Sequence, residues 1–177
     1  MLIEIFQHLF RFILLVFIQV LVLNKIEIGG ILNGYFNPFL YIMFILMLPV
    51  NINKVLLLFI AFLTGLTIDI FSGTPGMHAS ACLVLAFIRP GFLNLIAPRE
   101  GYETTLRLNI SGMGVRTFVV YAGVCTLVHH TVLFFIEAFN FVDILNLLLR
   151  IVTNSFSSFA LIMLSQVLSQ RTKDSTL

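Results

Sequence analysis

The sequence predicts an all-α membrane protein with six transmembrane helices, and three observations lead to this fold class. Of the 177 residues, 59% are hydrophobic and only 10% are charged. A soluble domain carries about 25% charged residues, because its surface must face water. The apolar residues gather in six segments that approach the roughly 20 residues needed to cross a bilayer. The basic residues, finally, gather at one side of these segments.

The six predicted spans follow one another without a long soluble insertion. We therefore expect one polytopic membrane domain over residues 1–170, followed by a short cytoplasmic tail over 171–177. The spans are residues 8–23, 38–50, 55–71, 77–97, 114–137 and 144–168. The second is short and lies between Pro38 and Pro49. The first lacks a small-residue cleavage site, which favours a retained span over a signal peptide.

Lysine and arginine residues orient the chain. If the N-terminus is cytoplasmic, seven basic residues lie at cytoplasmic ends and only Lys25 lies in an external loop. The seven are Arg11, Lys54, Arg99, Arg107, Arg116, Arg171 and Lys173. This bias predicts a multi-pass protein of the cell inner (cytoplasmic) membrane with both termini cytoplasmic. The scarcity of charged residues predicts membrane lipid as a partner, and the net charge of +2, without a dense basic patch, predicts no nucleic acid.

Ionisable side chains within spans are costly in lipid and therefore indicate a site. By their depth along the predicted helices, several polar side chains meet in the outer half of the bundle. They are Asp69, His78, His129, His130, Glu137, Arg150 and Asn154. In one interpretation they form a structural polar network, in which Asp69 or Glu137 neutralises Arg150. In the other, Asp69 and the histidines relay protons or bind a cation.

Two further features lie within predicted spans. Pro90 follows Arg89 near the middle of the fourth span and is expected to kink it. Arg89 then either bonds the carbonyls that the kink frees or pairs with an acid on a partner. The sixth span has a polar face that predicts helix packing, either inside the bundle or against another subunit. Its candidate residues are Asn146, Thr153, Ser157 and Ser158.

The one substantial cytoplasmic segment is residues 98–113. It combines both signs of charge around a tyrosine, which favours a protein-docking loop over a lipid-binding basic run. The candidate contact residues are Arg99, Glu100, Tyr102, Glu103 and Arg107. A solvated connector is the equally weighted alternative.

Motifs for hydrolytic or metal chemistry are missing from the sequence. It contains no H-E-x-x-H and no nucleophile motif. Cys82 and Cys125 each lie inside an apolar stretch, where small packing residues are common. We therefore expect no catalytic residue, no metal, no cofactor and no enzymatic activity. An intramembrane enzyme that uses His129 and His130 is the weakest of the alternatives.

Residues 69–103, DIFSGTPGMHASACLVLAFIRPGFLNLIAPREGYE, resemble the rod shape-determining MreD family. The run Asp-x-Phe-Ser-Gly, the following Gly-x-His and the Arg-Pro before PREGYE carry the resemblance, which extends to the length and span count of the whole chain. It implies a compact bundle similar to the S component of energy-coupling-factor transporters. The family brings no established active-site residues to transfer.

The resemblance also implies a function. It indicates a non-catalytic scaffold of the cell-elongation machinery that acts with MreC. The two would couple cytoplasmic MreB filaments to the peptidoglycan synthases, RodA and its class B penicillin-binding protein, and so maintain cell shape. The alternative is a small-molecule (vitamin) binding subunit of a transporter, of the S-component type. Such carriers have Ala-x-x-x-Ala in the first span, whereas this span contains no alanine.

Overall fold

The structure, a computed structural model, describes residues 2–25, 35–139 and 143–174. This part of the chain is all-α, with seven α-helices and one short 3₁₀-helix. They are α1 (Leu2–Leu21), η1 (Leu23–Lys25), α2 (Ile42–Leu46), α3 (Lys54–Ser72), α4 (Met77–Ile96), α5 (Ile110–Met113), α6 (Val115–Ala138) and α7 (Ile144–Asp174). Because α7 runs to Asp174, the predicted tail begins as helix, and residues 175–177 lie outside the described part.

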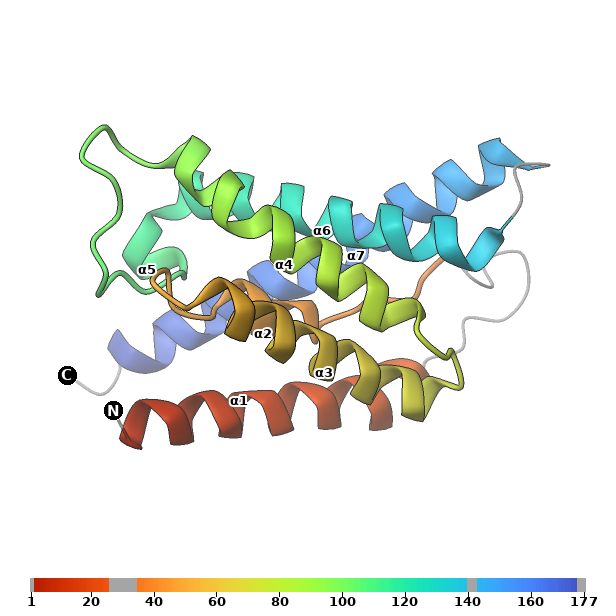
Figure 1. Ribbon diagram of the computed structural model, residues 1–177, viewed down its shortest axis with the longest axis horizontal. Helices are drawn as coiled ribbons and strands as arrows, with labels where there is room; N and C mark the ends of the chain where they lie inside the picture. Colours follow the sequence, from red (N-terminus) through yellow and green to blue (C-terminus); the bar gives the residue numbers. More distant parts are fainter. Residues whose placement is uncertain (1, 26–34, 140–142, 175–177) are drawn as a thin grey trace.

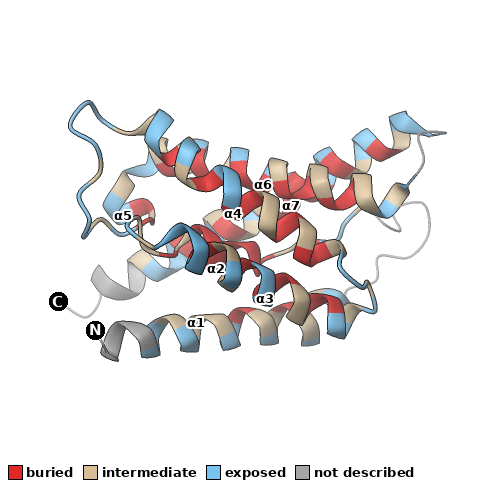
Figure 2. Cartoon of the chain, viewed as in Figure 1, coloured by how far each residue is buried: buried red, intermediate tan, exposed pale blue. Residues whose placement is uncertain are grey.

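Five of these helices, α1, α3, α4, α6 and α7, are long and apolar enough to cross a bilayer. The chain is therefore a multi-pass membrane protein. Large apolar side chains face outward, as Phe59, Phe87 and Phe156 do, each more than half exposed. Buried positions include charged and polar residues, and they lie along the middle of the bundle in Figure 2. This distribution suits a solvent of lipid tails, to which apolar side chains can be exposed without cost.

The long helices pack as neighbours along the sequence. Helix α3 packs against α4, α4 against α6, and α6 against α7. Helix α1 lies beside α3 and is the least buried of the five. The start of α1 and the end of α7 lie at the same end of the bundle, together with α5 and the segment before it (Figure 1). We call this the terminal end, and the other the distal end.

The expected helix over residues 38–50 is wrong, because only Ile42–Leu46 of that range form an α-helix. Residues 36–39 before it have no regular structure. We call residues 36–50 the threaded segment, since their trace, orange in Figure 1, runs between the long helices. Tyr41, Ile42 and Ile45 within it are completely buried. The segment therefore passes through the bundle and forms part of its buried core.

The length of the range 38–50 explains why most of it is not helical. Thirteen residues in a helix, at about 1.5 Å each, extend only about 20 Å, which is less than the roughly 30 Å of a hydrocarbon core. Five helical residues with eight extended ones reach at most about 34 Å. Proline at both ends of the range also restricts a longer helix. The same residues therefore cover more depth when most of them are not helical.

Candidate functional site

The threaded segment has backbone groups that no regular helix satisfies, and buried side chains bind them. In the distal half, the Asn37 amide donates to Asn154 Oδ1, and the Phe39 amide donates to Ser158 Oγ at 2.7 Å. Gln19 of α1 binds from the other side. Its Oε1 accepts from the Leu40 amide at 2.8 Å, and its Nε2 donates to the Pro38 carbonyl at 3.2 Å. Non-helical backbone is tolerated at membrane depth only when protein groups satisfy it in this way.

Arg89 and Tyr121 hold the other end of the segment. The Arg89 guanidinium donates to the Leu48 carbonyl, and at 3.4 Å to that of Pro49. Its Nε donates at 2.9 Å to the Tyr121 hydroxyl, which in turn donates at 2.9 Å to the Leu46 carbonyl. Arg89 is 1% exposed, and no carboxylate of the described residues lies within 4.0 Å of it.

In this structure Arg89 therefore does not bond the carbonyls that a kink at Pro90 would free. A kink at Pro90 frees the carbonyl four residues earlier in α4, whereas the guanidinium binds carbonyls of a different segment. Among the described residues its partners are neutral and lie within the bundle. The reason is that the threaded segment offers several unpaired carbonyl groups close to this depth.

The α3–α4 turn is organised by Asp69. Its carboxylate accepts from the amides of His78 and Ala79 at 3.0 and 2.9 Å, and from the Thr74 hydroxyl at 2.9 Å. The two amides belong to the first turn of α4, where N–H groups have no acceptor within the helix and the helix dipole also favours a negative charge. The two helices approach closely here. A Cβ atom on Gly65 would lie 2.5 Å from the backbone of Ala79.

Three histidines surround the distal half of the threaded segment. The Tyr41 hydroxyl lies 2.8 Å from both His78 Nδ1 and His129 Nε2. A hydroxyl donates one proton, so one of these nitrogens accepts it and the other must donate to the tyrosine oxygen. His129 Nδ1 is buried without a hydrogen-bond partner among the described residues. The proton arrangements of His78 and His129 are therefore coupled through Tyr41.

His130 has a single consistent hydrogen-bond direction. Its Nδ1 lies 2.8 Å from the Thr126 carbonyl, which can only accept, so Nδ1 carries the proton. In the neutral ring Nε2 is then an acceptor, and Ser158 Oγ donates to it at 3.0 Å. Because Ser158 also accepts from the Phe39 amide, the neutral histidine completes a chain of bonds that ends on the threaded segment.

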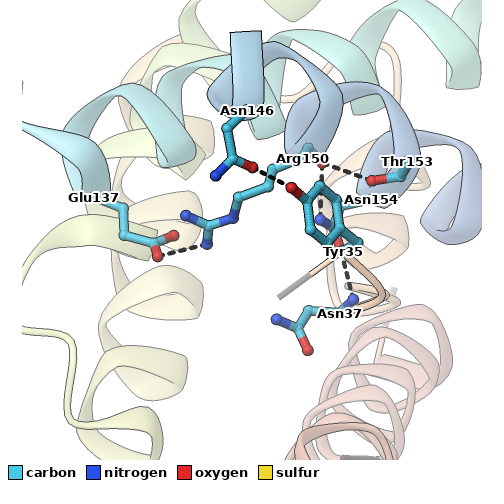
Figure 3. A network of polar contacts seen from close by, with 7 residues as sticks. All are labelled: Tyr35, Asn37, Glu137, Asn146, Arg150, Thr153 and Asn154. Carbon is cyan, nitrogen blue, oxygen red and sulfur yellow. Dashed lines mark hydrogen bonds and ion pairs between the residues drawn. The ribbon is translucent and has the colours of Figure 1, made fainter. Parts of the chain in front are cut away.

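Glu137 and Arg150 form a separate group at the distal end (Figure 3). Arg150 Nη2 lies 2.6 Å from Glu137 Oε1, and its guanidinium lies 4.8 Å from the centre of the Phe134 ring. Of the two carboxylates considered for Arg150, the structure pairs it with Glu137, because the Asp69 oxygens face the start of α4. The two charged side chains are 24% and 38% exposed, so solvent or headgroups screen the pair.

The four candidate packing residues of α7 have different environments. Asn146 Oδ1 accepts from the Tyr35 hydroxyl, as Figure 3 shows. Ser158 binds the threaded segment as described, and Ser157 is buried with its hydroxyl on the Asn154 carbonyl at 2.9 Å. Thr153 is exposed and donates to the Leu149 carbonyl of its own helix at 2.8 Å. Three of the four thus face the bundle interior.

The candidate partner loop lies at the terminal end. Arg99, Glu100, Glu103 and Arg107 are exposed. Tyr102 is half-buried, and its hydroxyl donates to the Ile96 carbonyl at 3.3 Å. Partial burial raises the pKa of the Tyr102 phenol, so the donor stays protonated at neutral pH. The four charged side chains are consequently free to meet water or a protein surface.

Sequence reasoning missed Gln19, Tyr41 and Tyr121, which supply much of the polar core. Gln19 had a visible signal, since it is the one amide in an otherwise apolar part of the first span. Tyr41 had none, because a tyrosine near the end of a span is usual at a membrane interface.

Within the ranges that the structure describes, no group of three His, Cys, Asp or Glu side chains is placed to hold a metal ion. Cys82 and Cys125 are both buried there as free thiols. Comparison of the chain with protein families, with curated proteins and with solved structures finds no match.

Proposed function

We propose that the chain is a non-catalytic scaffold of the cell-elongation machinery that acts with an MreC-like single-span protein. The proposal is based mainly on one observation. Asp69, His78 and Arg89, three polar residues of the stretch that resembles MreD, each bind groups of the fold itself. The Asp69 carboxylate, His78 Nδ1 and the Arg89 guanidinium thereby stabilise a turn and the threaded segment. A body built in this way acts through its outer surfaces.

The proposal also includes the number of membrane passes and their orientation. Five long helices and the threaded segment give six passes in a bundle of the S-component type, with the terminal end in the cytoplasm. The positions of Lys54 and Arg116 at the first turns of α3 and α6 support this orientation, because both turns lie at the terminal end. The membrane is then the inner membrane of the cell.

The proposal assigns cytoplasmic contact to the loop of Arg99, Glu100, Tyr102, Glu103 and Arg107. Its charged side chains are exposed and carry both signs, which suits a protein partner such as an MreB filament. MreC, RodA and the class B penicillin-binding protein would contact the apolar sides of the long helices. These contacts require no catalytic group in the chain.

The test is affinity purification of the tagged chain from gently solubilised membranes, followed by mass spectrometry. We expect an MreC-like protein together with wall synthases. The double variant Glu100→Gln/Glu103→Gln should lose the cytoplasmic partner. The double variant Thr104→Ala/Thr105→Ala, in the same exposed loop, should keep it. Recovery of an ATPase pair with a membrane coupling subunit would instead support the S-component alternative and overturn the scaffold.

A further inference from the structure

The distal end of the bundle holds a cleft of about 760 Å³. It lies between the end of α1, the α3–α4 turn and the facing ends of α6 and α7, with the start of the threaded segment also lining it. Clefts of about 300–1,000 Å³ are the usual size for small-molecule sites. The scaffold function makes no use of this space.

The walls of the cleft are largely aromatic and aliphatic. Phe39, Phe71 and Phe134 line it from three different elements. Asn24 and Asn37 add polar groups. A cleft with apolar walls and a few polar groups fits a ligand that has an apolar body and one polar end.

The charges in the cleft favour a negative polar end. Lys25, Arg150 and Glu137 line it, and the single carboxylate is already 2.6 Å from Arg150. No carboxylate of the described residues lies within 4.0 Å of Lys25. The three side chains sum to one positive charge. An incoming anion therefore meets a cation without having to displace Glu137.

His78 adds a further polar group to the cleft. It lines the cleft, and its Nδ1 is held by Tyr41 at 2.8 Å. Its Nε2 makes no hydrogen bond to another described residue. When Tyr41 donates to Nδ1, the neutral ring carries its proton on Nε2, which is then a donor for an acidic oxygen.

From these observations we propose that the cleft binds an amphipathic anion, with its apolar body against the phenylalanines and its acidic group between Lys25 and Arg150. The acidic group is a carboxylate, sulfonate or phosphate, borne by a soluble acid or by a lipid headgroup. This site goes beyond the scaffold function, and it holds or fails independently of any protein partner.

The test is protection of a cysteine placed in the cleft. Met77 lines the cleft at the first turn of α4, and both native cysteines are buried, so Met77→Cys gives one reactive thiol. Its reaction with N-ethylmaleimide, a neutral reagent, is followed in a zwitterionic detergent. Naphthalene-2-sulfonate should slow the reaction in a saturable manner. Naphthylmethylammonium, which has the same apolar body and the opposite charge, should not.

Charge variants show whether the cations cause the protection. Lys25→Gln should raise the sulfonate concentration needed for half-protection about three- to tenfold, since one ionic contact is lost. Lys54→Gln, at the terminal end, is the matched control and should leave it unchanged. Lys25 is exposed, and its side chain makes no hydrogen bond or ion pair with another described residue, so its replacement should leave the fold intact. Equal protection by both naphthalene compounds, protection by neither, or an unchanged Lys25→Gln variant would overturn the proposal.

The two sources of the anion are separated in phosphatidylcholine nanodiscs with and without phosphatidylglycerol. Protection by phosphatidylglycerol alone assigns the site to a lipid headgroup. Protection only after naphthalene-2-sulfonate is added assigns it to a soluble acid. Both outcomes support an anion site, whereas no protection in either nanodisc contradicts it.

Discussion

The Tyr121 hydroxyl lies between a buried cation and a buried carbonyl, so its removal tests how the threaded segment is held. It accepts from Arg89 Nε and donates to the Leu46 carbonyl, both at 2.9 Å, and the residue is completely buried. Tyr121→Phe keeps the ring and leaves both groups without this partner. At about 1–2 kcal/mol for each bond, the loss is about 2–4 kcal/mol. The average of about 0.6 kcal/mol found for bonds inside membrane bundles gives a lower figure of about 1 kcal/mol.

The assay is thermal unfolding of the purified protein in detergent. A loss of about 2 kcal/mol should lower Tm by about 4–8 °C for a chain of this size. Tyr102→Phe is the control, because its hydroxyl makes one 3.3 Å bond at a half-buried loop position and should change Tm by about 1–2 °C at most. If Tyr121→Phe lowers Tm no more than Tyr102→Phe does, the hydroxyl does not hold the threaded segment and the reasoning fails.

Three further variants test other contacts that hold the bundle together, each by the same unfolding measurement. Gly65→Ala should destabilise by about 1–3 kcal/mol, because its Cβ would lie 2.5 Å from backbone of α4, whereas Gly91→Ala, with open space around it, should be neutral or stabilising. Ser158→Ala should lose about 1–3 kcal/mol by unpairing a partly buried amide, and the exposed Thr153→Ala should lose less than about 0.5 kcal/mol. Asp69→Ala leaves two amides of α4 without their acceptor and should cost about 2–4 kcal/mol. A small loss for any of these three, equal to that of an exposed site, would contradict the corresponding contact.

Sequence patterns predicted the parts of the fold that depend on length and local chemistry. Long apolar runs gave five of the membrane-spanning helices, because a bilayer admits few other structures for such runs. Gly73, Pro75 and Gly76 are residues typical of a tight turn, and the turn that they form brings Asp69 to the start of α4. Both inferences use information contained in one stretch of chain.

The threaded segment could not be predicted in the same way. An apolar run of 13 residues fits a helix or an extended buried segment equally well, and periodicity does not separate them. A helix over this range would satisfy its own backbone, so the pattern does not assign Gln19 or Tyr121 as hydrogen-bond partners of the segment. Arg89 is anomalous as a charged residue within a predicted span, yet its partners are carbonyl groups, which have no signature in a sequence.

The order of synthesis gives the threaded segment a further consequence. Its partners Arg89, Tyr121 and Asn154 follow the residues they bind by 41, 75 and 117 positions. At about 5–20 residues per second, the last of them leaves the ribosome about 6–23 s after the segment does. During this interval the segment's unpaired amides must remain in a wet environment, such as the insertion machinery, because lipid would not accept them. Release into the bilayer before α7 is made would leave the Asn37 amide without Asn154, its acceptor.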